Sequence, residues 1–176
     1  IIILGLESAR QAVASLKKGR RIEELEQFAL NDSMTGFYNR NAYDYFIYNE
    51  KNIKNYMVVT FDLNNLKMCN DNYGHSSGDA YIIHSAHIIE TTFDRFGKCY
   101  RIGGDEFCCL IPDAAEFQIE RFIQKMQQDI AILNNKNIIP TEVGIACGYA
   151  LATPDDADIE KVRERADEMM YHNKKV

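Results

Sequence analysis

The 176-residue sequence has little basic charge and no long apolar segment. Its 20 Lys and Arg residues are outnumbered by 26 Asp and Glu residues, which gives a formal net charge of −6. A broad nucleic-acid-binding face needs clustered Lys and Arg to displace counterions, so we expect no nucleic-acid partner. No apolar run approaches the roughly 18 residues of a membrane-spanning helix, so we expect no membrane contact within this segment.

Paired cysteine motifs are also absent. The sequence has five cysteines and four histidines, but no C-x-x-C pair and no spacing typical of a zinc site. We therefore expect all five cysteines to be reduced and mostly buried, as in cytoplasmic proteins. The predicted location is cytoplasmic, although a longer protein containing this segment could be anchored in a membrane upstream of Ile1. The five cysteines are Cys69, Cys99, Cys108, Cys109 and Cys147.

A helical stalk is predicted for residues 1–30, ahead of one domain over residues 31–176. At roughly 150 residues per domain, the length allows a single domain with an extension. Apolar residues from Leu6 to Leu16 follow coiled-coil spacing. The basic run at 17–21 interrupts this stripe, which favours a linker helix. A helix packed on its own domain is the alternative.

The remaining chain alternates between helical and strand patterns. The order is helix, strand, helix, hairpin, helix, strand, helix, which predicts the α/β class with a mixed central sheet flanked by helices. Residues 64–79 are polar, and we expect no particular element there. Helices are expected over 39–48, 80–91, 114–133 and 159–173, and strands over 56–61, 98–102, 107–111 and 142–151.

Three acidic residues stand where a sheet presents functional groups. Asp62 follows the expected strand 56–61, while Asp105 and Glu106 lie in the hairpin turn. If that strand neighbours the hairpin, the three carboxylates converge and need a cation, for which hard oxygen ligands select Mg²⁺ or Mn²⁺. A metal between carboxylates and phosphates is typical of phosphoryl and nucleotidyl transfer. The alternative is an ordinary solvated acidic turn.

The hairpin and four further blocks resemble one protein family. The segment RIGGDEF resembles the signature of the GGDEF family of diguanylate cyclases. The other blocks resemble that family's remaining motifs in the same order, so the resemblance extends over about residues 31–176. They read DSMTGFYNR at 32–40, FDLNNLKMCND at 61–71, YGHSSGD at 73–79 and ADEMMY at 166–171.

This resemblance implies a fold similar to the catalytic palm of polymerases and nucleotide cyclases. It also implies Mg²⁺-dependent (or Mn²⁺-dependent) condensation of two GTP molecules into cyclic di-GMP and two pyrophosphates. Each GTP would sit on one protomer, so catalysis needs a homodimer. The stalk would connect this output domain to an upstream sensory domain of a signalling protein. A catalytically inactive GTP-binding regulatory module and a cyclase with another product are the alternatives.

The resemblance assigns the acidic residues to metal binding and catalysis. The implied metal ligands are Asp62, the backbone carbonyl of Leu63, Asp105 and Glu106, and the three acids are also the implied catalytic residues. Adjacent strand residues face opposite ways, so we rank Asp105 above Glu106 as a metal ligand. The usual second acid of this motif is replaced by Asn64, and we expect activity to survive that change.

The resemblance also assigns the substrate contacts. Asn70 and Asp79 fall where the family recognises guanine, whose N1–H and exocyclic amine suit a carboxylate acceptor. Lys67 and Lys174 correspond to phosphate-binding lysines. Gly103 and Gly104 have no side chains, so a nucleotide can lie against the hairpin.

Two further expectations concern structure and regulation. Asp32 and Arg40 are expected to be structural and to form a mutual ion pair. The family's product-inhibition motif has Arg and Asp at positions that hold Asp94 and Gly97 here. We therefore expect no inhibition by cyclic di-GMP through that site.

Overall fold

One of the two inner strands of the sheet is β1 (Met57–Leu63), a run of apolar and β-branched residues that is buried along almost its whole length. The computed structural model describes residues 18, 29–116 and 118–174, so nearly all of the predicted stalk lies outside the described residues. The other strands are β2 (Lys98–Arg101), β3 (Glu106–Ile111) and β4 (Ile145–Leu151), and the order in the sheet is β2-β3-β1-β4. Strand β1 pairs with β3 and β4, and β2 pairs with β3.

The expected α/β fold with a helix-flanked central sheet is confirmed. The three strand pairs are all antiparallel. Parallel pairing within the described ranges is limited to an isolated bridge between Tyr38 and Tyr100. The expected order of strands and hairpin is therefore correct. The sheet was expected to be mixed, but its strand pairs are antiparallel throughout.

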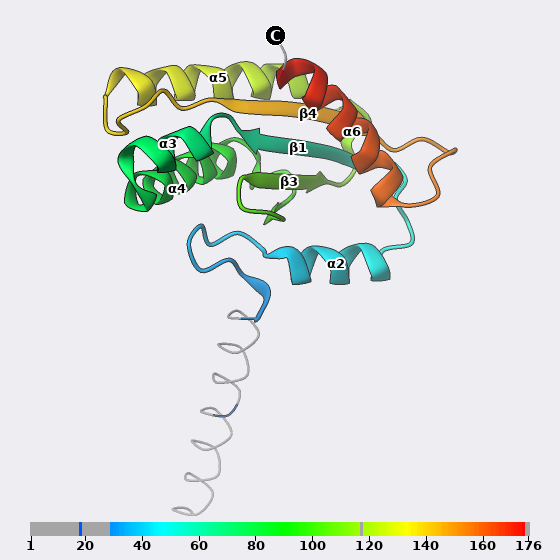
Figure 1. Cartoon of the computed structure of the whole chain (residues 1–176). Helices are drawn as coiled ribbons and strands as arrows, with labels where there is room; N and C mark the ends of the chain where they lie inside the picture. The colour runs from blue at the N-terminus through cyan, green and yellow to red at the C-terminus, as the bar shows by residue number, and fades with distance from the viewer. Residues whose placement is uncertain (1–17, 19–28, 117, 175–176) are drawn as a thin grey trace, which may run out of the picture.

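Helices cover both faces of this sheet (Figure 1). Alternate residues of β1, such as Phe61 and Leu63, pack in one apolar cluster with α3 (Leu66–Tyr73), α4 (His75–Phe93) and α5 (Ile119–Asn135). The residues between them face the other way, where Val58 packs in a second cluster with α2 (Arg40–Asn49) and α6 (Ile159–Lys174).

Two segments differ from the expected helices. The polar stretch 64–79 contains α3 and the beginning of α4, separated at Gly74, whose φ of 83° favours glycine. The apolar pattern there is weak because α3 buries only Leu66 and Cys69. The expected helix over 114–133 is divided into a short 3₁₀ turn, Ala114–Glu116, and α5.

Helix α6 lies directly on the backbone of β4. A Cβ atom added to Gly148 would collide with the backbone of Ala166 and Met170, so the glycine permits this close approach. At the end of the helix, Asn173 Nδ2 donates a hydrogen bond of 2.9 Å to the carbonyl oxygen of Cys147. These contacts fix where the last turn of α6 stands relative to the sheet.

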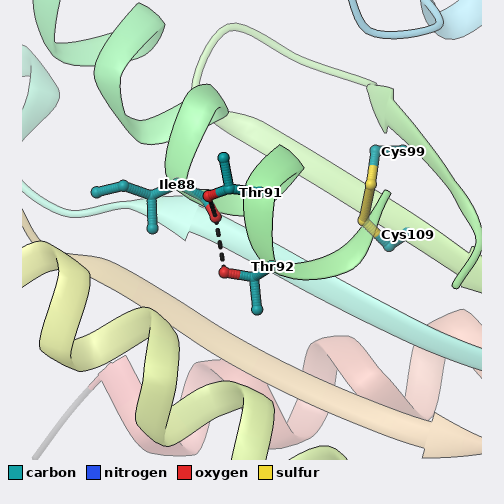
Figure 2. Close-up of a disulfide and its surroundings, with 5 residues drawn as sticks. All are labelled: Ile88, Thr91, Thr92, Cys99 and Cys109. Carbon is teal, nitrogen blue, oxygen red and sulfur yellow. Dashed lines mark hydrogen bonds between the residues drawn. A yellow bond between two sulfur atoms is a disulfide. The ribbon is translucent and has the colours of Figure 1, made fainter. Parts of the chain in front are cut away.

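The expectation of five reduced cysteines is wrong for one pair. Cys99 and Cys109 are opposite each other in the register of β2 and β3 and form a disulfide, shown in Figure 2. Their side chains lie in the cluster with α4, whereas Cys108, on the same strand, faces α6. Cys69, Cys108 and Cys147 are free and buried, and burial raises the pKa of each thiol, to about 12 for Cys147.

None of the helices in the described part of the chain combines the length and the apolar character needed to cross a bilayer.

The disulfide predicts a defined response to reduction. Under non-reducing conditions, thiol titration of the denatured chain should find three free thiols, and five after reduction. Because the bond closes a hairpin loop of 10 residues in sequence separation, its reduction should lower the free energy of unfolding by about 3 kcal/mol. The Cys99→Ser variant should lose this sensitivity and Cys69→Ser should keep it. Five free thiols in the unreduced protein would contradict the disulfide.

Candidate active site

Two acidic residues occupy paired positions at the ends of β1 and β3, beside the hairpin turn. Asp62 and Glu106 are direct Cα partners in the antiparallel register. Partners in such a pair share one face of the sheet, and here it is the face covered by α6. Asp105 precedes β3 in the turn, and its backbone carbonyl accepts a hydrogen bond of 3.0 Å from Leu63 N–H. The alternation of strand residues therefore selects Glu106, rather than Asp105, as the side chain opposite Asp62.

A lysine from the far end of the chain reaches this site. Lys174, the last residue of α6, has its Nζ 2.5 Å from Asp62 Oδ1 across 112 residues of sequence. The Asp62 side chain is only 15% exposed and that of Lys174 is 41% exposed. The sequence prediction that Lys174 belongs to the site is consistent with this position.

The two signature glycines have different surroundings. A Cβ atom on Gly103 would lie 2.8 Å from Glu106 Oε2 and 3.2 Å from Glu106 Cβ, so the Glu106 side chain packs against this glycine. A Cβ atom on Gly104 would meet open space. Gly103 therefore positions a carboxylate, while Gly104 leaves an open face on which a ligand can lie.

The residues expected to read a base lie on the α3–α4 helix pair. The side chain of Asn70 occupies the space where Gly78 lacks a Cβ atom, directly beside Asp79 in sequence. Lys67 and Asp79 are both exposed. The structure thus brings the half-buried Asn70 next to the turn of α4 that carries the exposed Asp79.

A buried tyrosine attaches this helix pair to the end of β1. Tyr81 Oη donates to the carbonyl of Asn64 at 2.7 Å and accepts a hydrogen bond of 2.7 Å from Gly144 N–H. Burial raises the pKa of Tyr81 to about 12, so its hydroxyl keeps the proton that it donates. Tyr81 is a residue that no sequence pattern points to, because its partners are backbone groups far from it in sequence.

The oxygen atoms at the end of β1 and the start of β3 suit a hard divalent cation. No group of three or more His, Cys, Asp or Glu side chains lies close enough to hold a metal within the described ranges. Asp62, Glu106 and the Leu63 carbonyl offer oxygen alone, and Mg²⁺ ordinarily completes such sets with water and substrate phosphates. The ammonium of Lys174 on Asp62 also shows that this carboxylate accepts a cation. The donor set therefore fits Mg²⁺ or Mn²⁺ delivered with a polyphosphate.

The expected ion pair between Asp32 and Arg40 is wrong. Arg40 is on an exposed face of α2 and pairs with Asp44, one helical turn away, at 2.8 Å. Asp32 instead binds Arg101 Nη1 at 3.0 Å, and Arg101 Nη2 donates to the Gly104 carbonyl at 2.8 Å. Arg101 stands two residues before Gly103, and this position was the available clue to its role as a clamp on the turn.

Thr35 completes the surroundings of Asp32. Its backbone N–H and hydroxyl both donate to Asp32 Oδ1, at 2.9 and 2.7 Å. Burial pushes the pKa of Asp32 upward, but the hydrogen bonds from Thr35 and Arg101 outweigh this effect and leave the pKa below its ordinary value of 3.8. The ionised carboxylate is therefore the form that holds the hairpin turn in place.

Comparison with known proteins points to one family. The sequence profile described as "Diguanylate cyclase, GGDEF domain" matches residues 29–176. Diguanylate cyclase DgcN of Escherichia coli is 31% identical over 157 residues, which cover 86% of this chain and 38% of DgcN. MucR of Pseudomonas aeruginosa, a bifunctional diguanylate cyclase/cyclic di-GMP phosphodiesterase, is 30% identical over 175 residues, which cover 94% of this chain and 25% of MucR. The chain thus spans well under half the length of these two relatives.

Solved structures share the fold. The coiled coil and GGDEF domain of DgcB from Caulobacter crescentus, solved in complex with c-di-GMP, aligns with a TM-score of 0.79 at 23% identity. The alignment covers 96% of this chain and 94% of that one.

The Asp32 contacts predict a pH-dependent loss of stability. Asp32→Asn should lower the free energy of unfolding by about 1–2 kcal/mol at neutral pH, because the charge-assisted bond to Arg101 is lost. Since the pKa of Asp32 is lowered in the folded state, wild type keeps this advantage above pH 3.8 and loses it as the pH falls through the folded-state pKa.

Urea denaturation from about pH 7 down to about pH 3 measures the difference. Asp44→Asn, which removes an exposed ion pair, should change stability by less than about 0.5 kcal/mol. A difference between wild type and Asp32→Asn that stays constant across this range would contradict the assignment.

Proposed function

Because the chain belongs to the GGDEF domain family of diguanylate cyclases, we propose that it condenses two GTP molecules into cyclic di-GMP and two pyrophosphates. The observation that carries the proposal is the register that sets Asp62 opposite Glu106 beside an intact GGDEF turn. Two carboxylates on one face, next to a glycine that leaves open space, are suited to a metal-bound triphosphate.

Asp62, Glu106 and the carbonyl of Leu63 would hold the Mg²⁺ or Mn²⁺ ion. When bound, such an ion neutralises charge on the α-phosphate and favours ionisation of the attacking hydroxyl. With Glu106 opposite Asp62, Asp105 is the signature acid left in the turn, and we assign it to accept the 3′-hydroxyl proton of the second nucleotide. This division of roles reverses the order in which the sequence pattern ranks the two acids for the metal.

The remaining residues bind and orient GTP. Lys174 and Lys67 would neutralise the triphosphate, and the exposed face of Gly104 would receive it. Asp79 would accept hydrogen bonds from the N1–H and the exocyclic amine of guanine, with Asn70 beside it. Adenine has no such pair of donors, so this arrangement would select GTP over ATP.

Two copies of the chain would act together. One site holds one GTP, and the 3′-hydroxyl of each nucleotide must attack the α-phosphate of the other, so the sites of a homodimer would face each other. Residues 1–30 would be the stalk that sets this geometry for an upstream sensory domain, and the GTP requirement suits a cytoplasmic location.

One observation favours a second candidate, a GTP-binding regulatory module without turnover. Asn64 stands where the family usually has an acid, so one negative charge is missing two residues after Asp62. Its buried Oδ1 has no hydrogen-bond partner. The Asp62–Glu106 pairing does not require that charge, so we prefer the active cyclase.

The test is turnover by the purified chain with GTP and Mg²⁺, with products separated by chromatography. We expect cyclic di-GMP and pyrophosphate, at a rate per chain that rises with protein concentration because two chains must meet. Glu106→Gln and Asp105→Ala should each lower the rate at least about a hundredfold. Glu90→Gln, an exposed change on α4, should have no effect. No product from an artificially dimerised chain would contradict the cyclase proposal, and GTP binding without turnover would favour the regulatory module.

Base selection is tested separately. Asp79→Ser should weaken GTP binding about 10- to 100-fold, because two charge-assisted hydrogen bonds are lost, and should leave ATP binding nearly unchanged. Asp71→Ser, a matched change at an exposed position of α3, should alter neither. Competition binding with GTP and ATP measures both effects. Unchanged selectivity in Asp79→Ser would remove Asp79 from the base-reading role.

A further inference from the structure

We propose that Lys174 acts as an internal counter-ion, which occupies Asp62 in the empty site and leaves it for the triphosphate when metal and nucleotide bind together. The inference rests on the proposed function, because it concerns the same site. It adds that the chain itself suppresses metal binding in the absence of nucleotide.

The ion pair has the burial that such an exchange requires. Asp62 is only 15% exposed, and a carboxylate at this depth is costly to leave without a positive partner. The Lys174 ammonium satisfies it from 2.5 Å. At 41% exposure, the lysine side chain is itself far less enclosed and stands on a flexible four-carbon stem, so it can move while Asp62 stays fixed.

The packing of α6 on β4 places Lys174 beside Asp62. The residue before it, Asn173, is bound to the Cys147 carbonyl at 2.9 Å. One strand residue further, Gly148 lets the α6 backbone approach β4 where any side chain would collide. The ammonium is therefore held near Asp62 by contacts that do not involve its own charge.

A divalent cation and the ammonium compete for Asp62. Two positive ions on one carboxylate repel each other strongly in a partly buried site. A free metal ion must displace Lys174 into solvent, whereas a metal–nucleotide complex offers phosphate oxygens to the displaced ammonium. Binding of metal and of nucleotide is then positively coupled, and by linkage the effect is reciprocal.

The test uses Mn²⁺ alone, added to the full chain without nucleotide, with free Mn²⁺ measured by electron paramagnetic resonance. Lys174→Ala should bind Mn²⁺ at least about fivefold more tightly than wild type, the amount expected from removing one ion pair. Lys174→Gln should behave like Lys174→Ala, and Lys174→Arg like wild type. Lys161→Ala removes an exposed positive charge elsewhere on α6 and should leave Mn²⁺ affinity unchanged.

The site of the effect is checked with Asp62→Asn in the Lys174→Ala background, which should abolish the gain in affinity. Equal Mn²⁺ affinity in wild type and Lys174→Ala, no measurable binding by Lys174→Ala, or a gain that survives Asp62→Asn would each overturn the exchange. If the wild type makes cyclic di-GMP but Lys174→Ala binds Mn²⁺ no more tightly than wild type, the exchange is overturned and the cyclase proposal stands. Tighter Mn²⁺ binding by Lys174→Ala, together with no GTP turnover by the wild type, would support the exchange and count against the cyclase.

Discussion

The antiparallel register between β1 and β3 is the constraint on which the candidate site depends. It sets Asp62 opposite Glu106 at the end of two strands that are otherwise almost entirely buried. A slip of one residue would turn Asp62 toward the apolar cluster of α3, α4 and α5 and turn Phe61 toward α6. The cost of burying that charge opposes the slip, so the packing of the core also positions the acids.

The sequence predicts much of this arrangement, for physical reasons that can be named. The apolar run of β1 has the composition of a buried strand, and the Gly-Gly turn between two apolar segments specifies a hairpin. Helix α3 is missed because its one buried side leaves little periodicity in a polar stretch. The disulfide is missed although a hairpin centred on Gly104 places Cys99 opposite Cys109, because the absence of a paired motif favoured reduced thiols.

The long-range contacts of the site are beyond sequence patterns. Lys174 reaches Asp62 because Gly148 and Asn173 determine how α6 lies on β4, which no local pattern encodes. The partner of Asp32 depends likewise on how the loop around it packs against β2, which ends at Arg101. Arg40 is nearer to Asp32 in the sequence but does not pair with it. The family motifs predict which residues form the site, while packing decides which of them meet.

These contacts explain how an acidic chain can suit an anionic substrate. The overall charge of −6 repels a triphosphate at long range, but the local field at Asp62 is set by a lysine, and by a metal ion once one is bound. The clamp of Arg101 on the turn and the bond of Tyr81 to the end of β1 hold the surrounding backbone. On the proposed exchange, the acids of the site stay in place and its cation changes.

A crystal structure of the chain with Mg²⁺ and a non-hydrolysable GTP analogue tests the central claim most directly. We expect the metal to contact the side chains of both Asp62 and Glu106 and the phosphates of the analogue, with Lys174 moved from Asp62 to a phosphate oxygen. A metal bound without Asp62, or a nucleotide seated away from the GGDEF turn, would contradict the assignment of this site.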